Sequence, residues 1–557
     1  MHRLLFIVPA LLLGSFLVVA PGQQSPAASK AVAPDPGMAR LRVKLNPEFP
    51  NWSPEYVAER CAEHLATINQ GYRCNIRYLD LSDVPRELLP AGVASIYFGT
   101  NSLHIAPLVA VPRPVPHTDN RIFWLDLMWY RWDREVWENI TNEDPYYREP
   151  LIPSTAKGWA YLREQTGSAG PIIRASWFNF YAFNTTEFLA KNEIQADNAF
   201  YYQLIFGLKE KVVEEKAIEK VKTKVPTVVR QLYSDGYRRW YQDVTVYEEK
   251  EETKEVVKQV KKKVVNAPAT AAEFEAFFRL NFKDLKDFPI DVGATVDEGF
   301  SGVSYRNRVL WRVRGNIGTY WRTFDVFRSV GDQDFIESPF PREFDAGEHI
   351  FQDAKGAQFY MLSDGAGKRV EFGDPRVVTG APAGHPAVIT AMGCIKCHDN
   401  GIIGFRNEHQ ILNKIGVKLY GLGYERSERF KQFFLNPRME RLVKLDQEEY
   451  AEFIRACNGL TPQENTAQFE KFRTWYGKPV TLVQAAREIG CEPKELEEAI
   501  GFGIGDLDNP QGTTKGRLGR LVLDGHPIPR LTWERGLYQE AFLLLLERRK
   551  HAKMPRR

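Results

Sequence analysis

Two cysteines and a histidine stand together in the segment "GCIKCHDNG", from Gly393 to Gly401. Cys394 and Cys397 are separated by two residues, and His398 follows directly. Three chemistries use such a cluster: covalent attachment of haem, ligation of zinc, and thiol–disulfide exchange. The rest of the chain has to discriminate between them.

Zinc ligation is the weakest of these interpretations. A structural zinc needs four ligands, usually supplied as two closely spaced pairs. The adjacent Cys397 and His398 are badly placed to ligate one metal together. The chain has six cysteines, and the four outside this cluster are isolated from it: Cys61, Cys74, Cys457 and Cys491.

Thiol–disulfide exchange is a stronger rival, because some exported disulfide isomerases also contain Cys-x-x-Cys-His. The apolar run "AVITAM" before Cys394 is compatible with the strand that precedes such a motif. That fold also needs further strands and a cis-proline loop downstream. After His398, however, the sequence has the spacing of helices, and Pro437 lies in a helix-rich stretch. We therefore keep exchange only as the less favoured alternative.

Covalent haem attachment requires the complete cluster and little else. The two thiols add across the vinyl groups of the porphyrin, and the following histidine ligates the iron. The sequence thus predicts one haem c bound through Cys394 and Cys397, with His398 as the proximal iron ligand.

The motif does not fix the sixth iron ligand. Met439, in "NPRMERL", lies at a separation ordinary for small c-type cytochromes and is the first candidate. An open sixth position, which would permit peroxide or small-molecule chemistry, stays an alternative. Four further residues are candidates: His409, Met361, His349 and His385.

The N-terminus has the pattern of an export signal. Arg3 precedes an apolar run, Leu4 to Ala20, and small residues follow it. We expect residues 1–27 to be a signal peptide or N-terminal anchor, and residues 28–45 to be a linker. The protein would then work in the periplasm or an equivalent extracytoplasmic space. In such an oxidising compartment the isolated cysteines either pair, as Cys61–Cys74 and Cys457–Cys491, or stay free.

The composition sets limits on partners. The chain is 43% hydrophobic and 26% charged, with a formal net charge of +3. Nothing in this balance points to a nucleic acid or an anionic membrane as partner. No later segment approaches the ~20 apolar residues that span a bilayer. Membrane contact is therefore expected only through an uncleaved N-terminal segment.

The patterns along the chain predict an α+β multidomain protein. Residues 46–206 mix helical and strand patterns, and residues 268–375 are β-rich, with two strands in "NRVLWRVRGNIGTYWRTFDVF" and a three-stranded meander in "EHIFQDAKGAQFYMLSDGAGKRVEF". Residues 376–557 are mainly helical. The charged insertion at 207–267 intersperses Lys and Glu around a Val/Ile stripe, which predicts either solvated helices or a long hairpin.

These segments also carry a family resemblance. "GCIKCHDNGII" followed by helices resembles a class I-like c-type cytochrome domain. "RIFWLDLMWYRWDREVWENITNEDPYY", "RASWFNFYAF", "SGVSYRNRVLWRV" and "DAGEHIFQDAKGAQFYML" are similar to segments of large exported c-type cytochromes of planctomycete bacteria. The resemblance covers most of the chain outside the charged insertion. It implies a cytochrome c-like haem domain after a long N-terminal region, and it implies no substrate.

Two classes of function follow from these observations. In the first, the haem transfers electrons and the N-terminal region docks a redox partner protein. In the second, the chain is a haem enzyme or sensor whose N-terminal region forms a pocket beside the haem. The N-terminal region contains no nucleophile elbow, zinc-protease motif or phosphate loop, which favours an electron-transfer component over a catalyst.

Overall fold

The computed structural model describes much of the chain after Asn51, namely residues 52–147, 156–183, 200–280, 290–295, 308–326, 344–373, 390–404, 438–504, 514–523 and 525–553. All of these segments belong to one compact unit, Glu48–Arg557. The predicted signal and linker lie outside the described residues. Within the described segments, no helix is both long and apolar enough to cross a membrane.

A four-stranded sheet, ordered β2-β3-β1-β4, organises the first part of this unit. Its strands are β1 (Ile76–Asp80), β2 (Arg113–Pro114), β3 (Ile122–Asp126) and β4 (Ile172–Arg174). The central strand β1 pairs antiparallel with β3 and parallel with β4. Helix α1 (Pro54–Thr67) begins directly after Ser53, because the Ser53 side chain accepts a hydrogen bond from the Tyr56 N–H and caps its first turn.

Short helices connect and cover these strands: α2 (Leu89–Ser102), α3 (Leu127–Tyr130), α4 (Arg134–Thr141), α5 (Lys157–Thr166), α6 (Ala175–Ala182) and α8 (Phe200–Phe206). Strand β3 is followed by α3 and then α4, so this part of the chain changes from strand to helix. Asp126 and Asp133 cap these two helices by accepting hydrogen bonds from the N–H groups of Met128 and Glu135.

The second sheet is a six-stranded antiparallel meander, ordered β12-β11-β10-β9-β8-β7. Its strands are β7 (Ile290–Thr295), β8 (Arg308–Arg314), β9 (Gly318–Asp325), β10 (Ala346–Asp353), β11 (Gln358–Asp364) and β12 (Arg369–Val370). The hairpin and the three-stranded meander predicted from the sequence are both confirmed. Alternating apolar residues with Gly-containing turns gave a clear signal here.

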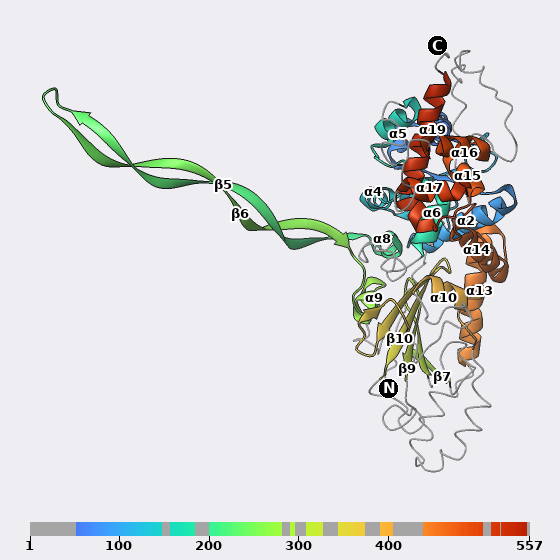
Figure 1. Cartoon of the computed structure of the whole chain (residues 1–557). Helices are drawn as coiled ribbons and strands as arrows, with labels where there is room; N and C mark the ends of the chain where they lie inside the picture. The colour runs from blue at the N-terminus through green and yellow to red at the C-terminus, as the bar shows by residue number, and fades with distance from the viewer. Residues whose placement is uncertain are drawn as a thin grey trace, which may run out of the picture. The chain divides into compact units, whose positions relative to one another are not determined.

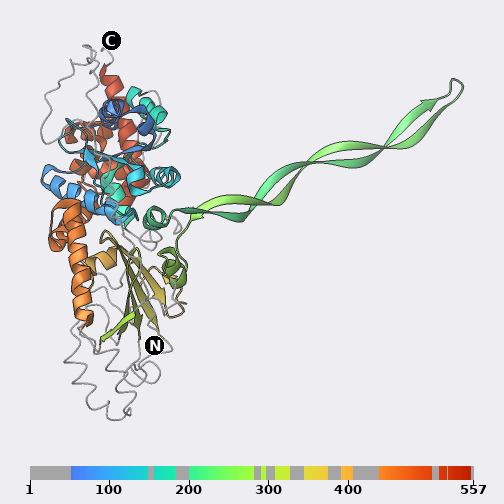
Figure 2. The same ribbon diagram turned by 180° about the vertical axis from the view of Figure 1, so that it is seen from behind.

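The two faces of the second sheet are covered differently. Helix α9 (Ala271–Phe277) lies against one face, where Phe278 just beyond it stacks on Phe351 with ring centroids 3.9 Å apart. Helix α13 (Arg438–Asn458) packs on the other face and appears in orange beside the sheet in Figure 2. There, the Asp446 carboxylate accepts hydrogen bonds from Arg312 of β8, at 2.8 and 2.9 Å. We call these the α9 face and the α13 face.

Alternation along β10 assigns neighbouring residues to opposite faces. His349 lies on the α9 face, since its Nδ1 is 2.6 Å from the Tyr320 hydroxyl, which in turn donates to Glu275 of α9. Glu348 therefore lies on the α13 face. This single-residue alternation decides which side chains of the meander can approach the cysteine cluster.

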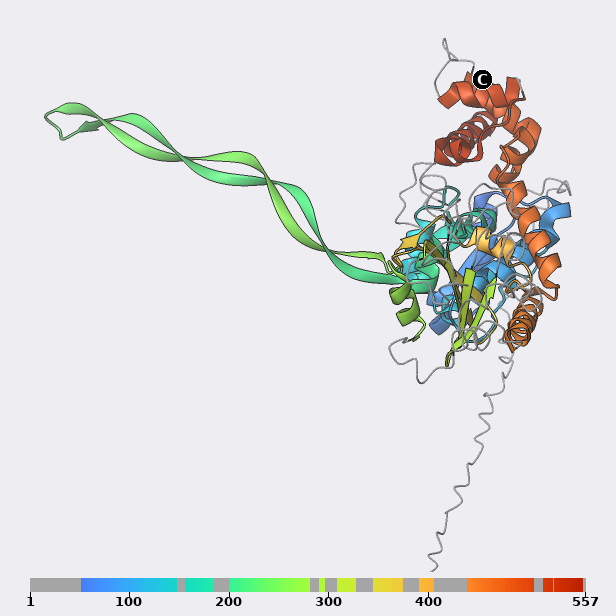
Figure 3. The same cartoon turned by 90° about the horizontal axis from the view of Figure 1, so that it is seen from below.

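The charged insertion is a long two-stranded hairpin, so the second of its two predicted structures is the observed one. Strands β5 (Leu208–Ser234) and β6 (Arg239–Val265) stay in register from Leu208–Val265 to Ser234–Arg239. Figures 1 and 3 show the strands coiling around each other along their whole length, as the right-handed twist of a β-ribbon requires. Abundant Val and Thr favour strand over helix.

The C-terminal helices pack back onto the first part of the unit. They are α14 (Pro462–Tyr476), α15 (Leu482–Ile489), α16 (Pro493–Ile504), α17 (Thr514–Leu523), α18 (Arg530–Thr532) and α19 (Tyr538–Lys553). Helix α14 contacts α2 and α6. The buried Tyr146 donates a hydrogen bond to Glu488 of α15 over 3.1 Å. The described chain is thus an α+β protein whose N-terminal and C-terminal parts share a core.

Candidate functional site

The cysteine cluster lies on the short helix α10 (Met392–Cys397). The His398 N–H donates to the Cys394 carbonyl over 2.7 Å, so Cys394 to His398 form one helical turn. Residues three apart lie on the same side of a helix. The turn therefore brings the Cys394 and Cys397 thiols to one side of α10.

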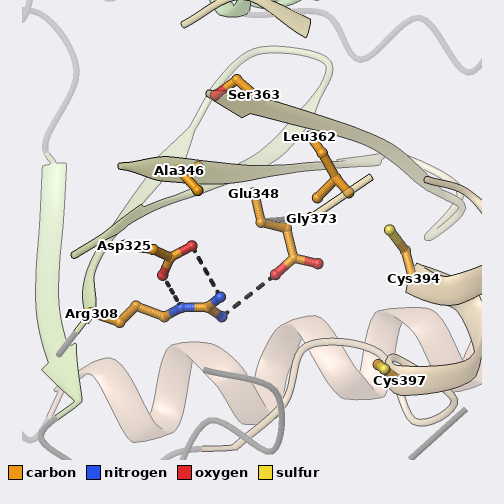
Figure 4. Close-up of a pocket in the computed structure, with 10 residues that line it drawn as sticks. Arg308, Asp325, Ala346, Glu348, Leu362, Ser363, Gly373, Cys394 and Cys397 are labelled. Atoms are coloured by element: carbon orange, nitrogen blue, oxygen red, sulfur yellow. Dashed lines mark hydrogen bonds and ion pairs between the residues drawn. The ribbon is translucent and has the colours of Figure 1, made fainter. Parts of the chain in front are cut away.

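Both thiols line a narrow pocket against the α13 face of the second sheet, shown in Figure 4. Its cavity volume is about 20 Å³. The opposite wall combines charged and apolar side chains, contributed by Arg308, Asp325, Ala346, Glu348 and Leu362. Distant segments of the sequence thus meet at the two cysteines.

His398 is held by hydrogen bonds at both ring nitrogens and is only 4% exposed. Nδ1 lies 3.0 Å from the Gly401 carbonyl oxygen, and Nε2 lies 3.2 Å from Oε1 of Glu348. A carbonyl can only accept, so Nδ1 carries a proton. Nε2 therefore remains as the nitrogen that faces the pocket wall.

The turn "HDNG" explains why the Gly401 carbonyl reaches Nδ1. Gly401 has φ +81°, a left-handed conformation that glycine adopts without steric cost. A Cβ at this position would lie 3.2 Å from the Cβ of Tyr450 on α13, which leaves little room for a side chain. The Gly401 N–H also bonds to the His398 carbonyl over 2.9 Å and closes the turn.

Glu348 links His398 to a buried ion cluster. Arg308 pairs with both oxygens of Asp325 and approaches Glu348 Oε2 at 3.5 Å (Figure 4). Burial opposes ionisation of Glu348, but His398 and Arg308 outweigh it and lower the pKa of Glu348 to about 2. The carboxylate beside Nε2 is therefore ionised at neutral pH.

The two thiols are poor nucleophiles in this environment. Burial and then the Glu348 carboxylate raise the pKa of Cys394 well above its ordinary value. The same causes raise the pKa of Cys397 to about 11. Exchange requires a thiolate at working pH. These shifts argue against the thiol–disulfide interpretation.

The structure separates the proposed distal ligands from one another. Met439 is buried on the first turn of α13, eleven residues before Tyr450, so roughly 16 Å of helix separates it from the residue that packs on Gly401. His349 and Met361 are paired across β10 and β11 on the α9 face, away from Glu348 and His398. Both nitrogens of His349 are engaged, by Tyr320 and Ser363. His385 and His409 lie outside the described residues.

All six cysteines are free, so neither of the two disulfides considered from the sequence is formed. Among the described residues there is also no group of three or more His, Cys, Asp or Glu side chains that could hold a metal ion on its own. A protein-only zinc site at the cluster is therefore not supported within the described segments.

The donor set suits haem c, while the cavity is narrow for it. Two thiols on one pocket and a histidine with an oriented Nε2 are the groups that covalent haem requires. A porphyrin needs far more than 20 Å³, since small-molecule sites are usually about 300–1,000 Å³. The pocket reaches Gly373, the last described residue before 374–389, and α10 is followed by 405–437, also outside the described range.

Sequence reasoning missed Glu348 and Arg308 as neighbours of the cluster. The only signal was charge at positions of β8 and β10 that alternation assigns to a buried face. Pairing them with His398 depends on long-range packing that no local pattern reports.

The chain was also compared with known proteins. No family model, no curated protein and no solved structure matches it.

Proposed function

We propose that the chain is an exported c-type cytochrome that transfers electrons. One haem c would be bound through Cys394 and Cys397, with His398 as the proximal ligand of its iron. The observation that carries the proposal is the geometry of this turn: both thiols line one pocket, and the Gly401 carbonyl fixes Nδ1 of His398 so that Nε2 faces the pocket wall.

When bound, the haem supplies reversible one-electron chemistry of iron. The chain's own residues orient and insulate the ligand. His398 is buried, and the Gly401 carbonyl accepts from its Nδ1–H and fixes the orientation of the ring, as outer-shell partners do in metal sites. Nε2 would hold the iron, and Glu348, whose Oε1 now lies 3.2 Å from Nε2, would keep Arg308 as its charged neighbour.

The remaining parts of the proposal follow from the sequence. Residues 1–27 would direct export to the periplasm or an equivalent space, where covalent haem is attached. The partner would be a redox protein, with no nucleic acid, and with membrane contact only through an uncleaved N-terminal segment.

Covalent attachment is the direct test. The full chain, produced with its export segment in a bacterium that has haem-attachment machinery, should show a haem-stained band after denaturing electrophoresis. Cys394→Ala or Cys397→Ala should weaken the band, and the double change should abolish it. Cys457→Ala is the matched control, because Cys457 is also a buried free thiol and should leave the band unchanged. An unchanged band in the double variant would refute the proposal.

Ligation by His398 needs its own measurement. His398→Ala should keep some haem on the two thioethers but change the absorption spectrum of the iron. A spectrum identical to that of the wild type in haem-loaded protein would show that another residue is the proximal ligand.

One observation favours a second function, a haem enzyme or sensor with an open sixth iron position. The group that faces Nε2 of His398 is a carboxylate, Glu348, whereas Met439 lies toward the far end of α13. Rapid binding of carbon monoxide or cyanide to the purified protein would support this function. Glu348→Gln should then change the binding rate, while haem attachment stays intact. Slow or absent binding would favour electron transfer.

A further inference from the structure

The amino-acid composition of the β5–β6 hairpin changes along its length. We call residues 208–224 and 248–265 the stalk, and residues 225–247 the tip. Every charged residue of the stalk is Lys or Glu, whereas every charged residue of the tip is Arg or Asp. Lys and Glu are depleted in protein interfaces, while Arg and aromatic residues are enriched. The tip therefore has the composition of an interface and the stalk that of a solvated surface.

Large apolar side chains of the tip are exposed. They are Val228, Val229, Leu232, Tyr233, Tyr237, Trp240, Tyr241, Val246 and Tyr247. Cross-strand pairing gathers them: Leu232 lies opposite Tyr241, and the Tyr233 ring stacks on Trp240 with centroids 6.2 Å apart. Alternation places Leu232 and Tyr241 on one face of the ribbon and Tyr233 and Trp240 on the other, so both faces of the tip expose apolar side chains, as interaction sites do.

The edge of β6 at the tip is open to another strand. A two-stranded hairpin alone is only marginally stable in water. In the stalk, Lys residues along both strands discourage edge pairing. In the tip, Pro226 interrupts the β5 edge because it lacks an N–H. The β6 segment 239–247, "RWYQDVTVY", has no Pro or Gly, strong strand propensity and cancelling charges.

We propose that two copies of this chain pair through the β6 edges of their tips, antiparallel about a two-fold axis at Tyr241. In this register Arg239 lies opposite Asp243 of the second copy, and the reverse pair forms by symmetry. Arg239, Tyr241 and Asp243 share one face of the strand. Asp243 already accepts a hydrogen bond from Arg230 of its own β5, over 3.1 Å, so it would lie between two guanidinium groups.

The remaining geometry supports a second copy as the occupant. Pairing converts two marginal ribbons into one four-stranded sheet, which meets the strand number that independent stability needs. The tip carries three Arg and two Asp, so two copies repel little. Antiparallel pairing also sends the stalks away from the joint in opposite directions, and each stalk is roughly 55 Å long, at ~3.3 Å per residue.

The oligomeric state of the full chain tests this inference without reference to haem. Sedimentation velocity over a concentration series should show a dimer for the wild type and a monomer for Tyr241→Lys, which places two like charges at the axis. Leu232→Lys is the matched control: Leu232 is 49% exposed and lies directly across from Tyr241 on β5, yet it is not on the pairing edge. This variant should remain dimeric.

Cross-linking tests the register. Tyr241→Cys should form a disulfide dimer on mild oxidation, because residue 241 faces its own copy, whereas Leu232→Cys and the wild type should not. A wild type that is monomeric at all concentrations, or a Tyr241→Lys variant that stays dimeric, would overturn the proposal. So would wild-type protein that stays monomeric while its tip binds lipid vesicles or a different protein.

Discussion

Two of the buried ionic clusters in the described part of the molecule differ in how fully their central carboxylates are partnered. Glu488 of α15 accepts four hydrogen bonds, two at each oxygen, from Gln484, Arg530, Tyr146 and Trp533. Glu348 of β10 has His398 at 3.2 Å and Arg308 at a long 3.5 Å. The first cluster is saturated, and the second is not.

The difference separates a structural role from a functional one. Both carboxylates are buried and ion-paired, so burial and charge alone would select either as a site. Glu488 joins Tyr146, Arg530 and Trp533 from distant parts of the sequence and leaves no oxygen free for a ligand. Glu348 instead lines a pocket with two thiols, and its Oε1 lies 3.2 Å from Nε2 of the oriented His398. A buried carboxylate that has few hydrogen-bond partners and lies beside reactive side chains is a better indicator of a functional site than burial and charge alone.

The largest effect should come from breaking the saturated cluster. Glu488→Gln leaves Arg530 without its paired charge and gives the amide only one acceptor oxygen for four donors. Removing one partner of a buried ion pair costs about 3–5 kcal/mol. Chemical denaturation should show this loss in the free energy of unfolding. Glu497→Gln, an exposed change on α16, should stay within about 0.5 kcal/mol. Equal effects of the two changes would refute the structural role.

Asp83, a buried carboxylate whose pKa is influenced by Glu488, should give the protein a pH dependence. Burial, only partly offset by Arg174, raises the pKa of Asp83 from 3.8 to about 6. The folded protein therefore holds a proton that the unfolded chain releases in this window, so stability falls as pH rises from about 4 to 6. The integrated change is at most about 3 kcal/mol.

Asp83→Asn should make that slope shallower, because the amide does not titrate, and Arg174 would keep its ion pair with Asp80 at 3.3 Å. Part of the slope should persist, because burial also raises the pKa of Glu534, to about 7. Measuring the free energy of unfolding at pH 4, 5 and 6 compares the two proteins. A wild type and a variant with parallel pH profiles would assign the dependence to other groups.

Glu348→Gln should cost less stability than Glu488→Gln, about 1.5–3 kcal/mol, as expected for hydrogen bonds to a charged group. Arg308 keeps Asp325 as its partner, and the amide oxygen of Gln can still accept from His398. We expect this change to alter the absorption spectrum of the iron in the haem-loaded protein, while the free energy of unfolding changes less than it does in Glu488→Gln. A destabilisation as large as that of Glu488→Gln would erase the distinction between the clusters.

The sequence predicted most of the strands and helices that it assigned within the described segments, because local signals specify them. Ser53 caps α1, and alternation with Gly turns defines the meander from β8 to β12. It also identified Cys394, Cys397 and His398, since their spacing is the motif. The sequence did not decide between helices and a hairpin for the charged insertion. Its Lys and Glu residues favour helix, while the interspersed Val and Thr favour strand.

Local sequence patterns could not predict which residues contact the cysteine cluster. Glu348 reaches His398 only because β10 presents alternate residues to the α13 face and α10 docks there, fifty residues later in the chain. The packing of α14 to α19 onto the first sheet was equally invisible, since it depends on contacts such as Tyr146 with Glu488 across 342 residues.

The smallest effect should come from Met439→Leu, which tests the sixth ligand named from sequence spacing. Met439 lies buried on the first turn of α13, and Leu has nearly the same volume, so the free energy of unfolding should change by less than about 1.5 kcal/mol. Because roughly 16 Å of helix separates Met439 from Tyr450, the residue packed on Gly401, we expect the iron spectrum to stay unchanged.

Met361→Leu, which changes a buried methionine on the α9 face, is the matched control for the loss of a core thioether. If Met439→Leu alone abolished the absorption of an iron–thioether bond and lowered the reduction potential, Met439 would be the distal ligand. In that case α13 would have to approach the cluster when haem binds.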